Sequence, residues 1–368
     1  MRIAILADPI DNQHAGIHVY TREMTEALIR NNPGHELILL RERTDANLKG
    51  AEQIIVWNTR LPIGFASLRL FFLIPFILHR KKIDIVIEPA HFGPFNLLSH
   101  IKRVTIIHDL TPILFPELHR WHSQFLQKIF LKGILNKTNL IISNSDNTSN
   151  DICKVYPKNC KKIKRIYPGV SSIFKPSNKH GVLDKYKITS PYFLFVGTIE
   201  PRKNLLVLLE AFKLFIQNSN SSFTLVIAGG IGWKAETFLE ALINHPYKDQ
   251  IVCTGFIALD DLPTLYSQAI TFIYPSLYEG FGLPIVEAMS CGTSVIAANN
   301  SSLTESGGKL THYFNANDPE ALSTLMFKAS RENIKQGKDS SAFTTYVKQF
   351  NWDAFAQTMW QDLLELKK

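Results

Sequence analysis

No stretch of this sequence is apolar for long enough to cross a membrane. The longest apolar run, from Leu70 to Leu78, has nine residues and is interrupted by Pro75, whereas a spanning helix needs about 20 residues. The first residues also lack the pattern of a secretory signal, because Asp8 follows the apolar start too soon. We therefore expect no membrane span, and we interpret residues 3–7 as a first buried strand.

Cysteine is scarce, since the chain has only Cys153, Cys160, Cys253 and Cys291. No two of them form a Cys-x-x-Cys pair, and no cluster of cysteine and histidine has the spacing of a zinc site. Unpaired thiols without an export signal are typical of the cytoplasm. We expect four free cysteines that serve as structural filler, no bound metal and a cytoplasmic protein.

Acidic residues are too few to balance the basic ones, and the imbalance lies in one half of the chain. The net charge is +8; residues 1–170 hold 23 Lys and Arg against 14 Asp and Glu, or +9, and residues 171–368 hold 17 against 18, or −1. A basic half indicates an acidic partner such as nucleic acid, anionic lipid or a phosphorylated substrate, although a merely solvated basic face has the same composition. No nucleic-acid-binding motif is present, so we expect no nucleic acid partner.

Short runs rich in Val and Ile alternate with longer amphipathic stretches. Such runs are typical of strands buried in a parallel sheet, and their alternation with helices is typical of βαβ units. The pattern pauses over about residues 167–190, which hold Pro168 and Pro176, and then starts again. We predict an α/β protein of two doubly wound, Rossmann-like domains, 1–170 and 190–350, facing a central cleft where ligands meet the carboxyl ends of the strands. Strands are expected at 3–7, 37–40, 54–57, 83–87, 104–107 and 140–143, and at 192–196, 224–228, 251–254, 271–274 and 294–298.

The strongest candidate site follows the expected strand 271–274. Gly280 and Gly282 allow a ligand to approach the backbone closely, and Pro284 suits the start of a helix. The amides from Phe281 to Leu283 would then face an anion at a helix N-terminus. We therefore predict a phosphate site at this turn.

Two acids bracket that turn. Glu287 would fall in the first turn of the helix, where a carboxylate can accept two hydrogen bonds from a ribose diol. Glu279 lies in the loop before the helix and could face a sugar. A Gly-rich turn flanked by two solvated acids is the alternative interpretation of the same residues.

A second segment, Gly197 to Asn204, follows the expected strand 192–196. Its adjacent Arg202 and Lys203 offer a planar fork and a point charge. Together they could neutralise a diphosphate and stabilise the charge that grows as it leaves. Solvated basic residues beside a helix cap are the alternative.

Two weaker signals lie in the first domain. His108, with Asp109 next to it, follows the expected strand 104–107 and could hydrogen-bond a sugar hydroxyl, although a lone histidine is often structural. Gly16 stands where a helix is expected to begin and could let the backbone approach a sugar or phosphate.

These pieces, in this order, resemble the retaining glycosyltransferases of family 4, which have the GT-B fold. The resemblance runs nearly end to end. It rests on Gly16-Ile17, His108-Asp109, the segment from Gly197 to Asn204, and the Glu-x7-Glu signature from Glu279 to Glu287. Residues 107–112 and 197–205 look most like those of bacterial mannosyltransferases of polysaccharide assembly.

The resemblance implies a hexosyltransferase that retains anomeric configuration and needs no metal and no cofactor beyond its nucleotide-sugar donor. It implies mannose from GDP-mannose as the sugar transferred, and a saccharide or lipid-linked saccharide of surface polysaccharide, such as lipopolysaccharide, as the acceptor. It places the enzyme in the cytoplasm, and the basic first domain suggests peripheral contact with anionic lipid on the inner face of the membrane. It also implies that the last helix, 352–368, packs back onto the first domain.

The same resemblance implies roles for single residues. Arg202 and Lys203 would hold the donor diphosphate, Glu279 and His108 would face the donor sugar, and these four would act in catalysis. Glu287 would bind the ribose. Gly16 would lie beneath the phosphate or acceptor, and Gly197 would be a further donor contact. Phe256 and Ile257 would lie at the base, and Gly280, Phe281, Gly282 and Leu283 at the pyrophosphate and sugar.

Other functions share this fold class. A nicotinamide dehydrogenase would need Gly-x-Gly-x-x-Gly after the first strand, and residues 4–16 do not contain it. A nucleotide-sugar epimerase of the same fold and a non-catalytic partner subunit of a glycosyltransferase both stay open. The epimerase differs in needing no acceptor to turn over its nucleotide sugar.

Overall fold

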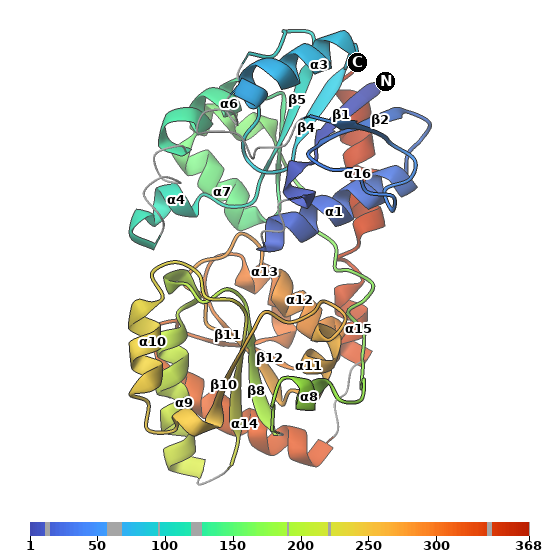
Figure 1. Cartoon of the computed structure of the whole chain (residues 1–368). Helices are drawn as coiled ribbons and strands as arrows, with labels where there is room; N and C mark the ends of the chain where they lie inside the picture. The colour runs from blue at the N-terminus through green and yellow to red at the C-terminus, as the bar shows by residue number, and fades with distance from the viewer. Residues whose placement is uncertain are drawn as a thin grey trace. The chain divides into compact units, whose positions relative to one another are not determined.

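The computed structural model describes the whole chain except residues 12–14, 57–67, 95, 119–126, 190, 220–221, 337–340 and 368. The chain divides into two units, each an α/β layer structure (Figure 1). The first comprises Met1–Pro116, Trp121–Gly169 and Asn351–Lys368, and the second comprises Glu117–Arg120 and Val170–Phe350. No helix of the described residues is long and apolar enough to cross a membrane.

The first unit is built on a parallel sheet of seven strands, as far as the chain is described. The strand order is β3-β2-β1-β4-β5-β6-β7, so the direction of winding reverses between β1 and β4. Alternate side chains of β1 enter different cores: Ile3 and Ile5 pack on one face and Ala4 and Leu6 on the other. The strands are β1 Arg2–Leu6, β2 Glu36–Arg41, β3 Glu52–Ile55, β4 Ile85–Glu88, β5 Lys102–Ile107, β6 Leu140–Ser143 and β7 Ile163–Arg165.

Helices cover both faces of this sheet. Helices α1 (Ala15–Arg30) and α16 (Trp352–Glu365) pack together on one face, and α16 lies in the first unit. Helices α3, α6 and α7 lie on the other face (Figure 1). Their bounds, with the shorter helical turns of this half, are η1 Asp8–Ile10, η2 Arg69–Leu73, α3 Ile74–Arg80, α4 Thr111–Leu114, η3 Pro116–Leu118, η4 Gln127–Leu131, α6 Lys132–Lys137, α7 Asp146–Val155 and η5 Pro157–Lys162.

The second unit has a parallel sheet of six strands within its described residues. Its order is β10-β9-β8-β11-β12-β13, and the winding reverses between β8 and β11. An aromatic cluster that includes Phe193, Phe215 and Phe223 fills one face of the sheet. The strands are β8 Tyr192–Val196, β9 Thr224–Ala228, β10 Ile251–Gly255, β11 Thr271–Tyr274, β12 Val295–Ala298 and β13 His312–Phe314.

The helices of the second unit follow the strands in turn. The longest, α9 and α14, pack against each other. Their bounds are α8 Val182–Lys185, η6 Pro201–Lys203, α9 Leu205–Ser219, α10 Glu236–Ile243, η7 Lys248–Gln250, α11 Leu262–Gln268, α12 Leu283–Ser290, α13 Leu303–Gly307, η8 Gly308–Leu310, α14 Pro319–Gln336 and α15 Ser341–Val347.

The sequence pattern did not predict two of the strands. β7 consists of Ile163, Lys164 and Arg165, and β13 begins at the exposed His312. Both stand at the edge of their sheet, where one side of the strand has no neighbour and charged side chains are tolerated. A search for buried apolar runs therefore cannot find them.

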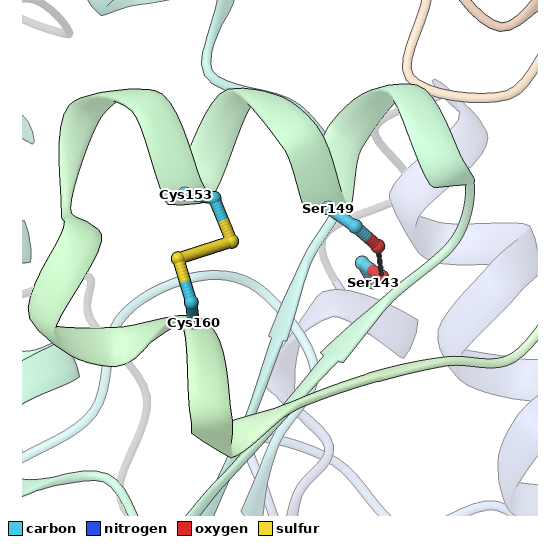
Figure 2. The surroundings of a disulfide bond; sticks show 4 residues. All are labelled: Ser143, Ser149, Cys153 and Cys160. Carbon is cyan, nitrogen blue, oxygen red and sulfur yellow. Dashed lines mark hydrogen bonds between the residues drawn. A yellow bond between two sulfur atoms is a disulfide. The ribbon is translucent and has the colours of Figure 1, made fainter.

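The expectation of four free cysteines is wrong. A disulfide joins Cys153 in α7 to Cys160 in η5 (Figure 2). Helix α7 ends just before Pro157, and the turn that follows brings the two Cα atoms to 5.0 Å from each other. The six residues between the cysteines fit no redox or zinc motif, so the spacing of the two cysteines does not indicate a disulfide. Cys253 and Cys291 keep their thiols.

A thiol count tests this pairing. Denatured protein should react with a thiol reagent at two sites before reduction and at four sites after it. Cys160→Ser should lower the free energy of unfolding by about 2 kcal/mol, because the cross-link limits the unfolded chain. Cys253→Ser, at an exposed thiol outside the pair, is the matched control and should change it little. Four reactive thiols before reduction would contradict the pairing.

Candidate active site

Two loops of the second unit come together where its sheet reverses direction. They follow β8 and β11, and ligands of doubly wound sheets bind at such a point. The backbone amide of Leu277 donates to the Arg202 carbonyl oxygen at 2.8 Å. The side-chain amide of Asn204, a residue in the left-handed conformation, donates to the Pro275 carbonyl oxygen at 3.1 Å. The loops that carry the predicted cations and Glu279 are therefore held against each other.

Glu279 bridges the two predicted cations. Its Oε2 accepts a hydrogen bond from Nη1 of Arg202 at 2.6 Å, and its Oε1 accepts one from Nζ of Lys203 at 2.5 Å. All three side chains are largely buried. The structure thus brings Glu279 to Arg202 and Lys203, which lie more than 70 residues earlier in the chain.

The charges of this group decide its chemistry. Burial alone would raise the pKa of Glu279, but Arg202 and Lys203 outweigh burial and lower that pKa to about 2. Burial lowers the pKa of Lys203, and the Glu279 carboxylate acts in the opposite direction. Glu279 is therefore a carboxylate at neutral pH and is unsuited to take or give a proton in the reaction.

Two further side chains complete the group, and the motif search did not single them out. Glu200 accepts a hydrogen bond from Nη2 of Arg202 at 2.7 Å, and the Tyr274 hydroxyl accepts one from Nζ of Lys203 at 2.7 Å. Tyr274 is the last residue of β11, and Glu200 lies in the loop after β8 that carries Arg202. Their places in or beside expected strands could have marked them as candidates, but the sequence does not show which side chains they contact.

The turn into α12 needs glycine at Gly282. Its φ is +96°, and a side chain there would meet Leu303 and Ser306 at 2.9 Å. Helix α12 starts at Leu283, so Pro284 lies within its first turn as expected. Gly282 offers no side chain to cap the first amides of the helix, and this suits a turn that receives an anion. Gly280 and Phe281 are buried in the same turn.

Glu287 lies one turn further along than predicted. It is the fifth residue of α12, in the second turn, and no acid stands in the first. Its Oε2 accepts a hydrogen bond from the hydroxyl of the buried Tyr266 at 2.9 Å. Burial raises the pKa of Glu287 to about 7, and the Tyr266 hydrogen bond only partly offsets it. Tyr266 was missed because nothing in the sequence relates α11 to α12.

Glycine ends three neighbouring strands of this sheet. Gly197 and Gly229 follow β8 and β9, and a side chain on Gly229 would lie 2.0 Å from the Gly197 carbonyl oxygen. Gly255 ends β10 with a φ of +68°. Just after Gly255, at the predicted base position, Phe256 is 85% exposed and Ile257 is buried. Gly229, missed from the sequence, could have been found from the Gly-Gly pair after β9.

His108 is a half-buried residue of the first unit and lies beside the buried His91. Its Nε2 bonds to the Pro89 carbonyl oxygen at 2.7 Å, and its backbone amide donates to Nε2 of His91 at 2.8 Å. The first bond requires a proton on Nε2 of His108, which leaves Nδ1 as an acceptor in the neutral ring. Burial, with His91 beside it, lowers the pKa of His108 to about 4.

Helix α1 borders His108. The ring of Tyr20 stands edge-on to the His108 ring, with centroids 4.6 Å apart. Gly16 is exposed in the first turn of α1, and a side chain there would meet nothing within 4 Å. Gly16 therefore has open space around it, whereas residues 12–14 before the helix lie outside the described chain.

The chain matches two family models, one for each half. Residues 14–172 match the Glycosyltransferase Family 4 model, and residues 183–349 match the Glycosyl transferases group 1 model. Among curated proteins it is 28% identical to the O-antigen chain mannosyltransferase B of Escherichia coli, over 96% of this chain and 97% of that protein. It is 27% identical to the O-antigen chain mannosyltransferase RfbU of Salmonella typhimurium, over 71% and 69%.

Solved structures share the fold at low identity. A sucrose-phosphate synthase from Thermosynechococcus elongatus has a TM-score of 0.79 at 18% identity, over 100% of this chain and 99% of that one. The Anabaena protein Alr3699/HepE, in complex with UDP and glucose, has a TM-score of 0.77 at 15% identity, over 99% and 100%. These likenesses confirm the predicted GT-B fold class, with a doubly wound sheet in each of the two units.

The environment of His108 predicts a pH dependence of stability. Between pH 6.5 and about 4 the unfolded chain takes up a proton on this residue and the folded chain does not. The free energy of unfolding should therefore fall with falling pH across that window, by up to about 3 kcal/mol. His108→Gln should remove most of this part of the slope. Denaturant unfolding at several pH values measures it, and equal slopes for both proteins would contradict the assignment.

Proposed function

Because this chain belongs to the glycosyltransferases, joining a Family 4 domain to a group 1 domain, we propose that it transfers mannose from GDP-mannose to a saccharide or lipid-linked saccharide of surface polysaccharide. The observation that carries the proposal is the buried pair of cations, Arg202 and Lys203, at the reversal point of the second sheet. The choice of mannose draws on the two O-antigen mannosyltransferases that the chain resembles.

The cations would act on the donor diphosphate. As the bond between the anomeric carbon and the phosphate oxygen breaks, negative charge accumulates on the leaving diphosphate. Lys203 and Arg202 are fixed in place by Glu279 before the donor arrives, so they need no reorganisation to meet that charge. The turn at Gly282 would add backbone amides at the start of α12.

The acceptor proton needs a base, and Glu279 is a poor one. Its pKa of about 2 leaves it unable to hold a proton at neutral pH. We therefore assign the proton to an oxygen of the leaving phosphate: the acceptor oxygen bonds to the anomeric carbon on the face that the phosphate leaves, and its proton passes to that phosphate. This geometry retains the anomeric configuration and uses no metal. Glu279 would position the cations, and any contact of its carboxylate with the sugar is a further prediction of the resemblance.

Other residues would position the donor. A free oxygen of the Glu287 carboxylate would accept hydrogen bonds from the ribose diol, while Tyr266 holds the other oxygen. The exposed ring of Phe256 offers a flat apolar surface for the base. Neutral His108, with Nδ1 as acceptor, would take a hydrogen bond from a sugar hydroxyl.

The experiment that tests the reaction is an acceptor-dependence assay. Purified protein with GDP-mannose should release GDP at a rate that rises when a mannose-containing acceptor is added, and the product linkage should be α. Release without acceptor dependence, or interconversion of the nucleotide sugar, would favour the epimerase. No turnover with GDP-mannose, UDP-glucose or UDP-galactose and a panel of acceptors would favour a non-catalytic subunit. The cytoplasm, where nucleotide sugars are available, is the proposed location.

Loss of a cation should slow turnover more than it weakens donor binding. Lys203 interacts more strongly with the leaving diphosphate than with the ground-state donor, so Lys203→Ala should lower kcat about 100-fold with a smaller change in KM. Glu287→Ala should chiefly raise the donor KM, because the ribose changes little during the reaction. Lys213→Ala removes a lysine of another Lys–Glu pair, on α9, and is the matched control. Melting temperatures of all three variants show whether each is folded. Near-normal turnover of Lys203→Ala would contradict the assignment of Lys203 to the leaving diphosphate.

Donor binding should depend on pH through Glu287. The ionised carboxylate accepts two hydrogen bonds from the diol and the protonated form does not, so the donor KM should fall as pH rises through about 7. Tyr266→Phe removes a hydrogen bond that favours the ionised form, so the midpoint should move to higher pH. Glu287→Gln should make the donor KM nearly independent of pH in this range. A midpoint that Tyr266→Phe leaves in place would contradict this role of the hydroxyl.

A further inference from the structure

The two faces of the first unit's sheet carry opposite charge. On the face covered by α3 and α6, residues 68–82, 127–137 and 157–162 hold ten Lys and Arg and no Asp or Glu. On the other face, α16 holds Asp353, Asp362 and Glu365 and no basic residue, and α1 holds two of each sign. The excess positive charge of the chain is therefore gathered on one side of one sheet.

Most of these basic side chains reach solvent. The exposed ones are Arg80, Lys82, Lys128, Lys132, Lys137, Lys158 and Lys161. Among the others, Arg69 is buried against Asp8 and Lys81 pairs with Glu52. The acids of the neighbouring α7 do not cancel them, since Asp146 pairs with Arg165 and Asp151 is buried. We call the exposed surface of the three segments the basic face.

Apolar side chains project from the same face. Leu68, Phe72 and Phe76 follow one another at intervals of four residues, which puts them in one line along the helix formed by η2 and α3. Phe72 is 64% exposed and Phe76 59%, and among the described phenylalanines only Phe256 is more exposed. Ile129 on η4 is 51% exposed. The inner side of the helix, with Ile74 and Leu78, lies in the core, whereas Leu68, Phe72 and Phe76 lie outside the core clusters of the described residues.

We propose that the basic face docks on an anionic lipid bilayer, with Phe72 and Phe76 entering the interface and the lysines meeting the headgroups. Aromatic side chains in line on a helix that lies in the membrane plane, ringed by cations, suit such a surface. A soluble polyanion would use the cations and gain little from two exposed phenylalanine rings. The proposal does not depend on the sugar donor, although a lipid-linked acceptor would be met at this surface.

Flotation of the full chain with vesicles tests this directly, without donor or acceptor. Binding to vesicles of phosphatidylcholine with 30% phosphatidylglycerol should exceed binding to phosphatidylcholine alone, and it should fall as salt rises from 0.1 to 0.5 M. Phe72→Ser with Phe76→Ser should lower the partition coefficient about tenfold or more. Lys128→Gln, Lys132→Gln and Lys137→Gln together should lower it on the order of 100-fold, since each cation near the surface contributes about fivefold.

Matched controls lie in the second unit. Ile243→Ser removes an equally exposed apolar side chain, and Lys248→Gln, Lys309→Gln and Lys348→Gln together remove three exposed lysines. Both should bind vesicles as the parent does. Melting temperatures of all variants should agree, because every substituted side chain is exposed.

Three results would overturn the proposal. They are binding to neither vesicle, equal binding to neutral and anionic vesicles, and equal losses in the control variants. Loss of binding in the lysine variant with full binding in the phenylalanine variant would show that charge alone drives the binding. A soluble polyanion would then be favoured as the partner of the basic face, in place of a bilayer. Because no sugar transfer is measured, these results are separate from those that test the glycosyltransferase reaction.

Discussion

The candidate site of the second unit depends on the bridge from Glu279 to Arg202 and Lys203. Two adjacent cations in one buried turn repel each other, and a carboxylate that contacts both makes their burial tolerable. Removing one partner of such a group leaves an unpaired buried charge, at a cost on the order of 3–5 kcal/mol. The bridge is possible only because the sheet reverses direction between β8 and β11, so that loops distant in sequence end side by side.

The same constraint explains where the chain needs glycine. At Gly229 a side chain would overlap the backbone of Gly197, and at Gly282 it would strike α13. Gly229 lies where β9 ends and Gly282 lies where α12 begins, so at both positions the backbone itself forms the surface that a ligand would meet. In the first unit the corresponding edge carries histidine side chains instead, and Nε2 of His91 accepts a hydrogen bond from the backbone amide of His108.

Much of this could be predicted from the sequence because its signals are local. Apolar runs located most strands, and strand ends located the loops with Arg202, Lys203 and Glu279. What could not be predicted depends on contacts across the fold. Edge strands such as β7 carry charged residues, and the disulfide depends on a turn after α7 rather than on a motif. Likewise, Tyr266 contacts Glu287 only because α11 and α12 pack together. The bridging role of Glu279 could not be predicted either, because it depends on contacts with Arg202 and Lys203, which are distant in the sequence.

The bridge also bears on how a diphosphate could be handled. Arg202, Lys203, Glu200 and Glu279 together carry no net charge when all are ionised, so this group attracts a ground-state donor only weakly. Two N–H groups of Lys203 already serve Tyr274 and Glu279. The interaction of a phosphate oxygen with these cations strengthens as the negative charge on that oxygen grows, because the oxygen then competes better with the two carboxylates. The four side chains carry no net charge together, yet their cations favour a ligand whose negative charge is growing. Such a group binds the transition state better than the substrate, which is the condition for catalysis. The carboxylates that make the cations tolerable in the folded chain therefore also set how late in the reaction the cations act.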